Sequence, residues 1–210
     1  MYRVLTLSLC LIFGSLNILS AANGDSRKNS IINFDSIAKE IKAMPFNKAR
    51  IDSTIKLLNI YNSKKESDIL LDILRDDTPK IKNKDYTLQL YFYEIIAGKR
   101  DNNLQKAKKF LDKIRPLCTT EDDYILYFNS LSLIVHECVL KRNFEEAYDI
   151  IQKGKRLSLL LNSNIIDYTI TKCLVYFYND TENFEKMKDL VLLTLNDPKL
   201  DPINKRELYG

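Results

Sequence analysis

The sequence predicts an all-α protein in which pairs of helices stack on one another as a solenoid. Only five glycines and five prolines occur in 210 residues, too few for a fold of many short strands joined by turns. Three segments of one pattern recur at a constant spacing of about 40 residues, which is typical of repeat architectures. Hydrophobic residues make up 45% of the chain, enough for a globular core.

Residues 1–22 are predicted to be an export signal. Arg3 gives a short positive start, and an apolar run follows from Val4 to Leu19. Ser20-Ala21-Ala22 then supplies the small residues of a cleavage site. We expect cleavage after Ala22 and a mature chain located in the periplasm.

Two alternatives remain for this segment, and no other stretch of the chain is predicted to span a membrane. The run is short for a spanning helix, which needs about 20 apolar residues, but an uncleaved anchor is one alternative. Lipid attachment at Cys10 is the other. After the signal, residues 23–46 are expected to form a linker and an N-terminal capping helix, whose apolar residues are Phe34, Ile37 and Ile41.

The repeated segments each contain an Asn, a large apolar residue, two polar residues and a small or flexible apolar residue. They are 103–107, 143–147 and 183–187. Apolar residues recur around them at intervals of three and four, which predicts helices. We expect helical hairpins with turns near 99–103, 141–143 and 179–183, and an earlier degenerate unit from about 47 to 75. Together these make about four units over 47–200.

Helix boundary signals agree with this division. Thr120 and Asp123 have the spacing of a capping box at the start of a helix. Pro116 and Pro198 fall where helices are expected to end.

These residues resemble the tetratricopeptide repeat family, in which a small residue early in the second helix lets two helices approach closely. Ala107 and Ala147 match that position, and Met187 matches it less well. The resemblance covers about 47–200 and implies a right-handed superhelical solenoid. The period of about 40 residues is longer than that of the family, which is about 34. The usual small residue of the first helix is also replaced, by Ile95, Val135 and Val175.

The exported, Asn/Lys/Ile-rich repeats further resemble the extracytoplasmic regions of Bacteroidota sensor kinases and regulators. That resemblance implies the sensory or scaffolding part of a signalling protein. Residues 201–210 lie where the next first helix would begin, and are expected to start a truncated further helix.

No catalytic or metal site is predicted. His136 is the only histidine, so a multi-histidine metal site cannot form, and no phosphate-binding loop or zinc-protease motif occurs. Cys118, Cys138 and Cys173 are expected to behave as small buried hydrophobes, with a disulfide as the alternative. No cofactor is expected. Acidic and basic residues are interleaved around a net charge of +4, so nucleic-acid binding, which needs a concentrated basic patch, is not expected.

A protein or peptide is the expected partner, because the resemblance implies a groove lined by the first helix of each unit. The mixture of polar and aromatic residues there, with modest positive charge, suits an extended peptide or a helix. Two other functions remain open: a structural role with self-association through an exposed repeat end, and sensing of a small molecule or glycan stacked on Phe92 and Tyr176. The groove candidates are Gln89, Phe92, Ile96, Lys99, Asn129, Ser132, His136, Thr169, Lys172 and Tyr176.

Overall fold

The structure is a computed structural model that describes residues 33–198 and 201–202. All of its helices belong to one unit that begins at Phe34. The predicted export signal (1–22), most of the predicted linker and residues 203–210 lie outside the described residues.

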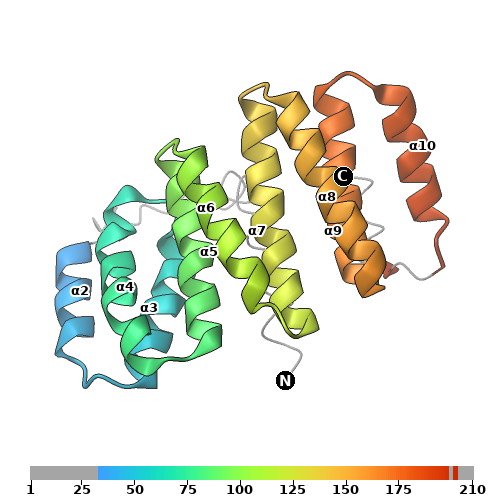
Figure 1. The fold of residues 1–210 in the computed structure, drawn as a ribbon. Helices are drawn as coiled ribbons and strands as arrows, with labels where there is room; N and C mark the ends of the chain where they lie inside the picture. The colour runs from blue at the N-terminus through green and yellow to red at the C-terminus, as the bar shows by residue number, and fades with distance from the viewer. Residues whose placement is uncertain (1–32, 199–200, 203–210) are drawn as a thin grey trace, which may run out of the picture. The chain divides into compact units, whose positions relative to one another are not determined.

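Within these residues every regular element is a helix, which confirms the predicted all-α class (Figure 1). Two short 3₁₀ turns, η1 (Lys65–Ser67) and η2 (Arg115–Leu117), precede α4 and follow α6. The α-helices are α2 (Phe34–Ala43), α3 (Lys48–Tyr61), α4 (Asp68–Ile81), α5 (Lys84–Arg100), α6 (Leu104–Ile114), α7 (Glu121–Leu140), α8 (Phe144–Leu161), α9 (Asn164–Asp180) and α10 (Phe184–Leu195).

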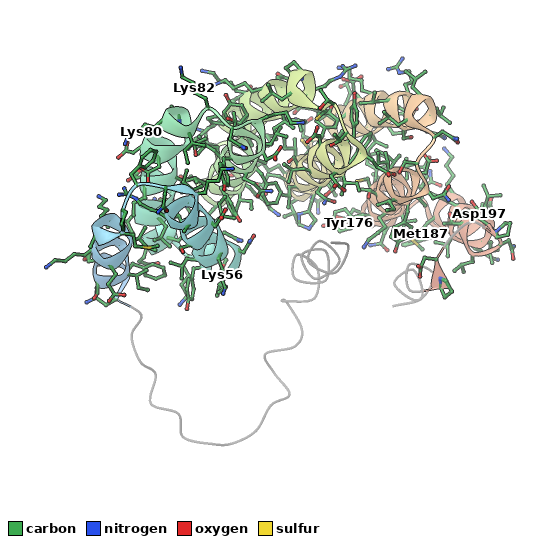
Figure 2. The ribbon with its side chains drawn as sticks, turned by 90° about the horizontal axis from the view of Figure 1, so that it is seen from below. Lys56, Lys80, Lys82, Tyr176, Met187 and Asp197 are labelled. Atoms are coloured by element: carbon green, nitrogen blue, oxygen red, sulfur yellow. The ribbon has the colours of Figure 1, made fainter. Side chains whose placement is uncertain are left out.

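The helices pack as successive pairs: α3 with α4, α5 with α6, α7 with α8, and α9 with α10. The first helices, α3, α5, α7 and α9, also contact one another in that order. Each second helix contacts the first helix of the following pair. Lys56 in α3 and Tyr176 in α9 lie on the side opposite to Lys80 and Lys82, which come from the end of α4 (Figure 2). We call the surface of α3, α5, α7 and α9 that carries Lys56 and Tyr176 the first-helix face.

Residues at equivalent positions of successive units are buried in the core. Ala107 and Ala147, at the predicted small-residue position, are both fully buried. A Cβ placed on Gly98 of α5 would lie 3.3 Å from the Cβ of Ala107, so α5 and α6 pack closely at this point. Leu111 and Ile151, one helical turn further on, are also buried, and full burial of such a side chain stabilises a fold by about 1.5–3 kcal/mol.

The turn inside each hairpin repeats at the level of the backbone. Asn102, Arg142 and Glu182, each one repeat apart, all adopt the left-handed conformation, with φ of 59°, 57° and 56°. In each turn the next residue donates a backbone hydrogen bond to the carbonyl five residues earlier, at 2.7, 2.8 and 2.8 Å. This bond closes the end of the first helix. All three turns fall where the sequence predicts them.

Helix ends follow the sequence signals with one exception. Both hydrogen bonds of the capping box form between Thr120 and Asp123. Pro116 lies in η2, directly after α6, and Pro198 follows the end of α10. The expectation that the first unit ends near residue 75 is wrong, because α4 continues through Pro79 to Ile81. The buried Asp77 pairs with Arg50 of α3 at 2.7 Å and holds this last part of α4 in place.

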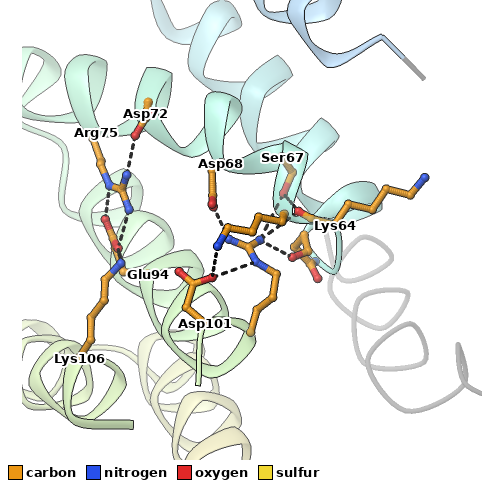
Figure 3. Close-up of polar contacts among 11 residues, drawn as sticks. Lys64, Ser67, Asp68, Asp72, Arg75, Glu94, Asp101 and Lys106 are labelled. Atoms are coloured by element: carbon orange, nitrogen blue, oxygen red, sulfur yellow. Dashed lines mark hydrogen bonds and ion pairs between the residues drawn. The ribbon is translucent and has the colours of Figure 1, made fainter. Parts of the chain in front are cut away.

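Polar bridges join the units as well (Figure 3). Arg75 of α4 and Lys106 of α6 both pair with Glu94 of α5, whose side chain is buried. Burial opposes ionisation of Glu94, but the hydrogen bonds from these two cations outweigh it, so the pKa of Glu94 is lowered. A second bridge joins Arg100 of α5 to Asp68 of α4.

None of the described helices is both long enough and apolar enough to cross a membrane.

Replacing Arg142 with glycine is expected to stabilise the fold by about 0.5–1 kcal/mol, because glycine adopts the left-handed conformation without the steric cost of a side chain. Arg156 is an exposed residue inside α8, where the same Arg→Gly change should destabilise by about 1 kcal/mol. Urea unfolding measures both. Midpoints that move in the same direction for the two variants would contradict the turn geometry.

Candidate functional site

Three of the predicted groove residues meet on the first-helix face. Lys99 of α5, His136 of α7 and Tyr176 of α9 come from three consecutive first helices. The rings of His136 and Tyr176 are stacked, with centroids 4.7 Å apart and planes inclined by 20°. Lys99 Nζ lies 3.4 Å from His136 Nδ1. We call these three residues the Lys99–His136–Tyr176 column.

The column follows from the repeat. His136 and Tyr176 are one repeat apart and so occupy the same position in successive units. Because α7 and α9 pack directly against each other, equivalent side chains on one face become neighbours. Lys99 lies one helical turn beyond the equivalent position of α5, which residue 96 occupies, and its long side chain reaches the imidazole.

Burial determines the protonation of the column. It lowers the pKa of His136, and the positive charge of Lys99 lowers it further, against a smaller opposing effect of Glu137 and Asp180. The imidazole is therefore mainly neutral at pH 7. In this arrangement His136 Nδ1 accepts a hydrogen bond from the Lys99 ammonium group. The single proton of the neutral imidazole ring is therefore on Nε2. Burial also lowers the pKa of Lys99, and Glu137 only partly offsets this effect.

Lys99 differs from the other half-buried cations that join neighbouring units. Arg75 and Lys84 each bind a buried carboxylate, that of Glu94 or Asp123, and Lys108 binds Glu146. Among the residues that the structure describes, no carboxylate forms an ion pair with Lys99. A partly desolvated ammonium group without an ion pair favours an incoming anion.

The other candidates on these helices are engaged locally. Ser132 Oγ donates to the carbonyl of Asn129 at 2.8 Å, and Thr169 Oγ1 donates to the carbonyl of Ile165 at 3.0 Å. Lys172 lies over the ring of Tyr168, 5.4 Å from its centroid. Gln89 and Asn129 are half-buried on α5 and α7. Hydroxyls bound to their own helix remain able to accept one more hydrogen bond each.

One candidate, Phe92, lies elsewhere than expected. Phe92 is only 7% exposed and packs edge-on against Tyr93, with ring centroids 5.6 Å apart. The prediction that Phe92 lines the groove is therefore wrong, because a large ring at this position gains more from burial than from contact with solvent. Ile96 lines a small cavity between α3, α4 and α5, together with Leu58 and Arg100.

Sequence reasoning missed Glu137 and Asp180, which act on the column through their charge. Glu137 is largely buried next to His136 and pairs with Lys141 at 3.3 Å. The spacing of four residues between Glu137 and Lys141 was a usable signal. Asp180 follows Tyr176 by four residues, which places it on the same side of α9.

The thiols are poorly suited to nucleophilic chemistry. Cys118, Cys138 and Cys173 are buried and free. Burial raises the pKa of Cys118 and Cys138 to about 11, and that of Cys173 to about 12, so all three are protonated at neutral pH. A protonated thiol is a weak nucleophile and a poor metal ligand. Within the described residues, no three His, Cys, Asp or Glu side chains are grouped so as to hold a metal ion.

Comparison with protein-family models, curated proteins and solved structures finds no match to this chain. A function for this chain is therefore inferred from the side chains of the first-helix face.

Stability is expected to fall as the pH drops from 7 to 5, because His136 binds a proton less readily in the folded protein than in the unfolded chain. The folded pKa lies below the ordinary value of 6.5, so protonation below that pH favours the unfolded state. The chain has no other histidine, and the lowered pKa values of Glu94 and Asp123 act at more acidic pH.

Urea unfolding at several pH values measures this dependence, and His136→Gln should flatten it between pH 7 and 5. Equal slopes in the two proteins would show that the imidazole is not held in its neutral form.

Proposed function

We propose that this chain is a non-catalytic protein-interaction module of tetratricopeptide type, which binds an acidic segment of a partner protein on its first-helix face. The observation that carries the proposal is Lys99, a half-buried ammonium group without a carboxylate partner among the described residues. It lies on a layer of helices that contact one another along the stack.

Repeated features of the described hairpins support the tetratricopeptide type. The left-handed turns at 102, 142 and 182 recur at a constant interval, and the small residues Ala107 and Ala147 are buried between paired helices. We propose a right-handed superhelix on this basis. The periplasmic location and the place in a signalling protein rest on the pattern of residues 1–22 and on the resemblance to sensor regions.

In the proposed complex, a carboxylate of the partner pairs with Lys99 Nζ. The ammonium group then gains the counter-charge that Glu137 supplies only at a distance. A hydrogen bond to a charged group contributes about 1.5–3 kcal/mol net. The stacked rings of His136 and Tyr176 form a firm surface beside it, on which the backbone of an extended peptide can lie.

The alternative of a glycan sensor has less support. That hypothesis depended on two exposed rings, but Phe92 is buried and the ring of Tyr176 already stacks on His136. Catalysis also has little support, because His136 Nδ1 faces a cation instead of a nucleophile.

A displayed library of random 12-residue peptides, selected on the purified chain, tests the proposal. The selected peptides should contain Asp or Glu, and amide replacement of those residues should abolish binding. Lys99→Met should weaken binding of the selected peptides by about tenfold, the equivalent of about 1.4 kcal/mol.

Lys109→Met is the matched control, because Lys109 is exposed on α6, a second helix, and this variant should bind like the unchanged chain. Peptides that lack acidic residues, or equal affinity for the Lys99→Met variant, would overturn the proposal.

A further inference from the structure

His136 lies directly beside the ammonium group that the proposed partner would bind. Its Nδ1 is 3.4 Å from Lys99 Nζ, and its ring is stacked on that of Tyr176, with centroids 4.7 Å apart. These two contacts hold the imidazole between α5 and α9, with Nδ1 next to the ammonium group. Both Lys99 and His136 are half-buried, so part of each side chain remains open to an incoming group.

The charged groups that act on the imidazole come from three neighbouring helices. Burial lowers the pKa of His136 most, and the positive charge of Lys99 on α5 lowers it further. Glu137 of α7 and Asp180 of α9 raise this pKa by a smaller amount. Glu137 already pairs with Lys141 at 3.3 Å, so it offers the imidazole only part of its charge.

The remaining neighbours of the imidazole leave its protonation unchanged. Lys108 of α6 and Glu146 of α8 pair with each other, and both act on the thiol of Cys138 instead. Burial raises the pKa of the Tyr176 hydroxyl, so the ring stacked on His136 is neutral. A change of charge at the neighbouring ammonium group is therefore the change to which the imidazole responds.

A carboxylate bound at Lys99 reverses the effects that keep the imidazole neutral. It cancels the positive charge that opposes protonation of His136. It can also accept a hydrogen bond from a protonated Nδ1 while it accepts one from Nζ, because an ionised carboxylate has about four acceptor positions. A nearby negative charge and a hydrogen bond to the charged form both raise the pKa of an imidazole.

We infer that His136 is a second ligand for the partner's carboxylate beside Lys99, and that its imidazole takes up a proton when the partner binds. This inference rests on the proposed function, because the carboxylate is that of the acidic segment. A complex that holds more protons than its separate components becomes tighter as the pH falls. The acidic partner is therefore bound more tightly at mildly acidic pH than at neutral pH.

Isothermal titration calorimetry with one acidic 12-residue peptide from the displayed library tests the inference at pH 8 and pH 6. The peptide is acetylated and contains no histidine, and its Asp and Glu side chains titrate near pH 4, outside this range. Its affinity should be about five- to tenfold higher at pH 6, because the bound imidazole is protonated there.

His136→Gln is the matched variant, since glutamine keeps a polar side chain at this position but does not titrate. It should bind the peptide like the unchanged chain at pH 8, and no more tightly at pH 6. The same pH dependence in the variant and the unchanged chain would overturn the inference.

Nuclear magnetic resonance gives a second measurement that needs no substitution. The chain has a single histidine, so the imidazole signals of an untagged sample report its pKa directly. This pKa should rise when the peptide saturates the chain. A peptide that binds equally at both pH values, or that leaves the imidazole pKa unchanged, would overturn the inference alone. Selected peptides without acidic residues would overturn the proposed function as well.

Discussion

The packing of each second helix beneath the first helix of the following pair is the contact on which this structure depends. A hairpin of two amphipathic helices exposes apolar sides that it cannot bury alone. The helix α8 is enclosed from both sides, because a Cβ on Gly154 would lie 2.7 Å from Ile170 Cδ1 of α9 and 3.2 Å from Leu131 Cδ1 of α7. The residues of α10 equivalent to Ala147, Ile151 and Gly154 are Met187, Val191 and Thr194, and they are only half-buried.

Polar contacts set the register of this stacking. Glu94 stands where the next two units have Ile134 and Leu174, and it is buried because Arg75 and Lys106 bind it from both neighbouring helices. A buried carboxylate without both partners would carry a large desolvation cost. Lys84 and Asp123 form a comparable bridge between α5 and α7. Such pairs favour one alignment of neighbouring units, whereas apolar contacts alone would tolerate several.

The same stacking produces the candidate site. His136 and Tyr176 hold the same position of successive units and lie side by side on α7 and α9, and Lys99 reaches them from one helical turn further along α5. Lys99 there meets a neutral imidazole instead of a carboxylate. In the internal salt bridges each cation, such as Arg75 or Lys84, is paired with a carboxylate. Lys99 has no such partner among the described residues, and this difference distinguishes the column from the internal salt bridges.

The residue pattern by itself determined the helices, their hairpin turns and the constant spacing of the repeat, because apolar periodicity and the signals at Thr120 and Pro116 are local properties of the chain. The resemblance to tetratricopeptide repeats, and not the pattern alone, implied that the first helices line the face, and so gave Lys99, His136 and Tyr176 as candidates. Only the tertiary structure decided that these three meet, that Phe92 is buried and that Glu94 has partners in α4 and α6. These facts depend on contacts between units, and the side chains that cover a residue come from helices distant in sequence.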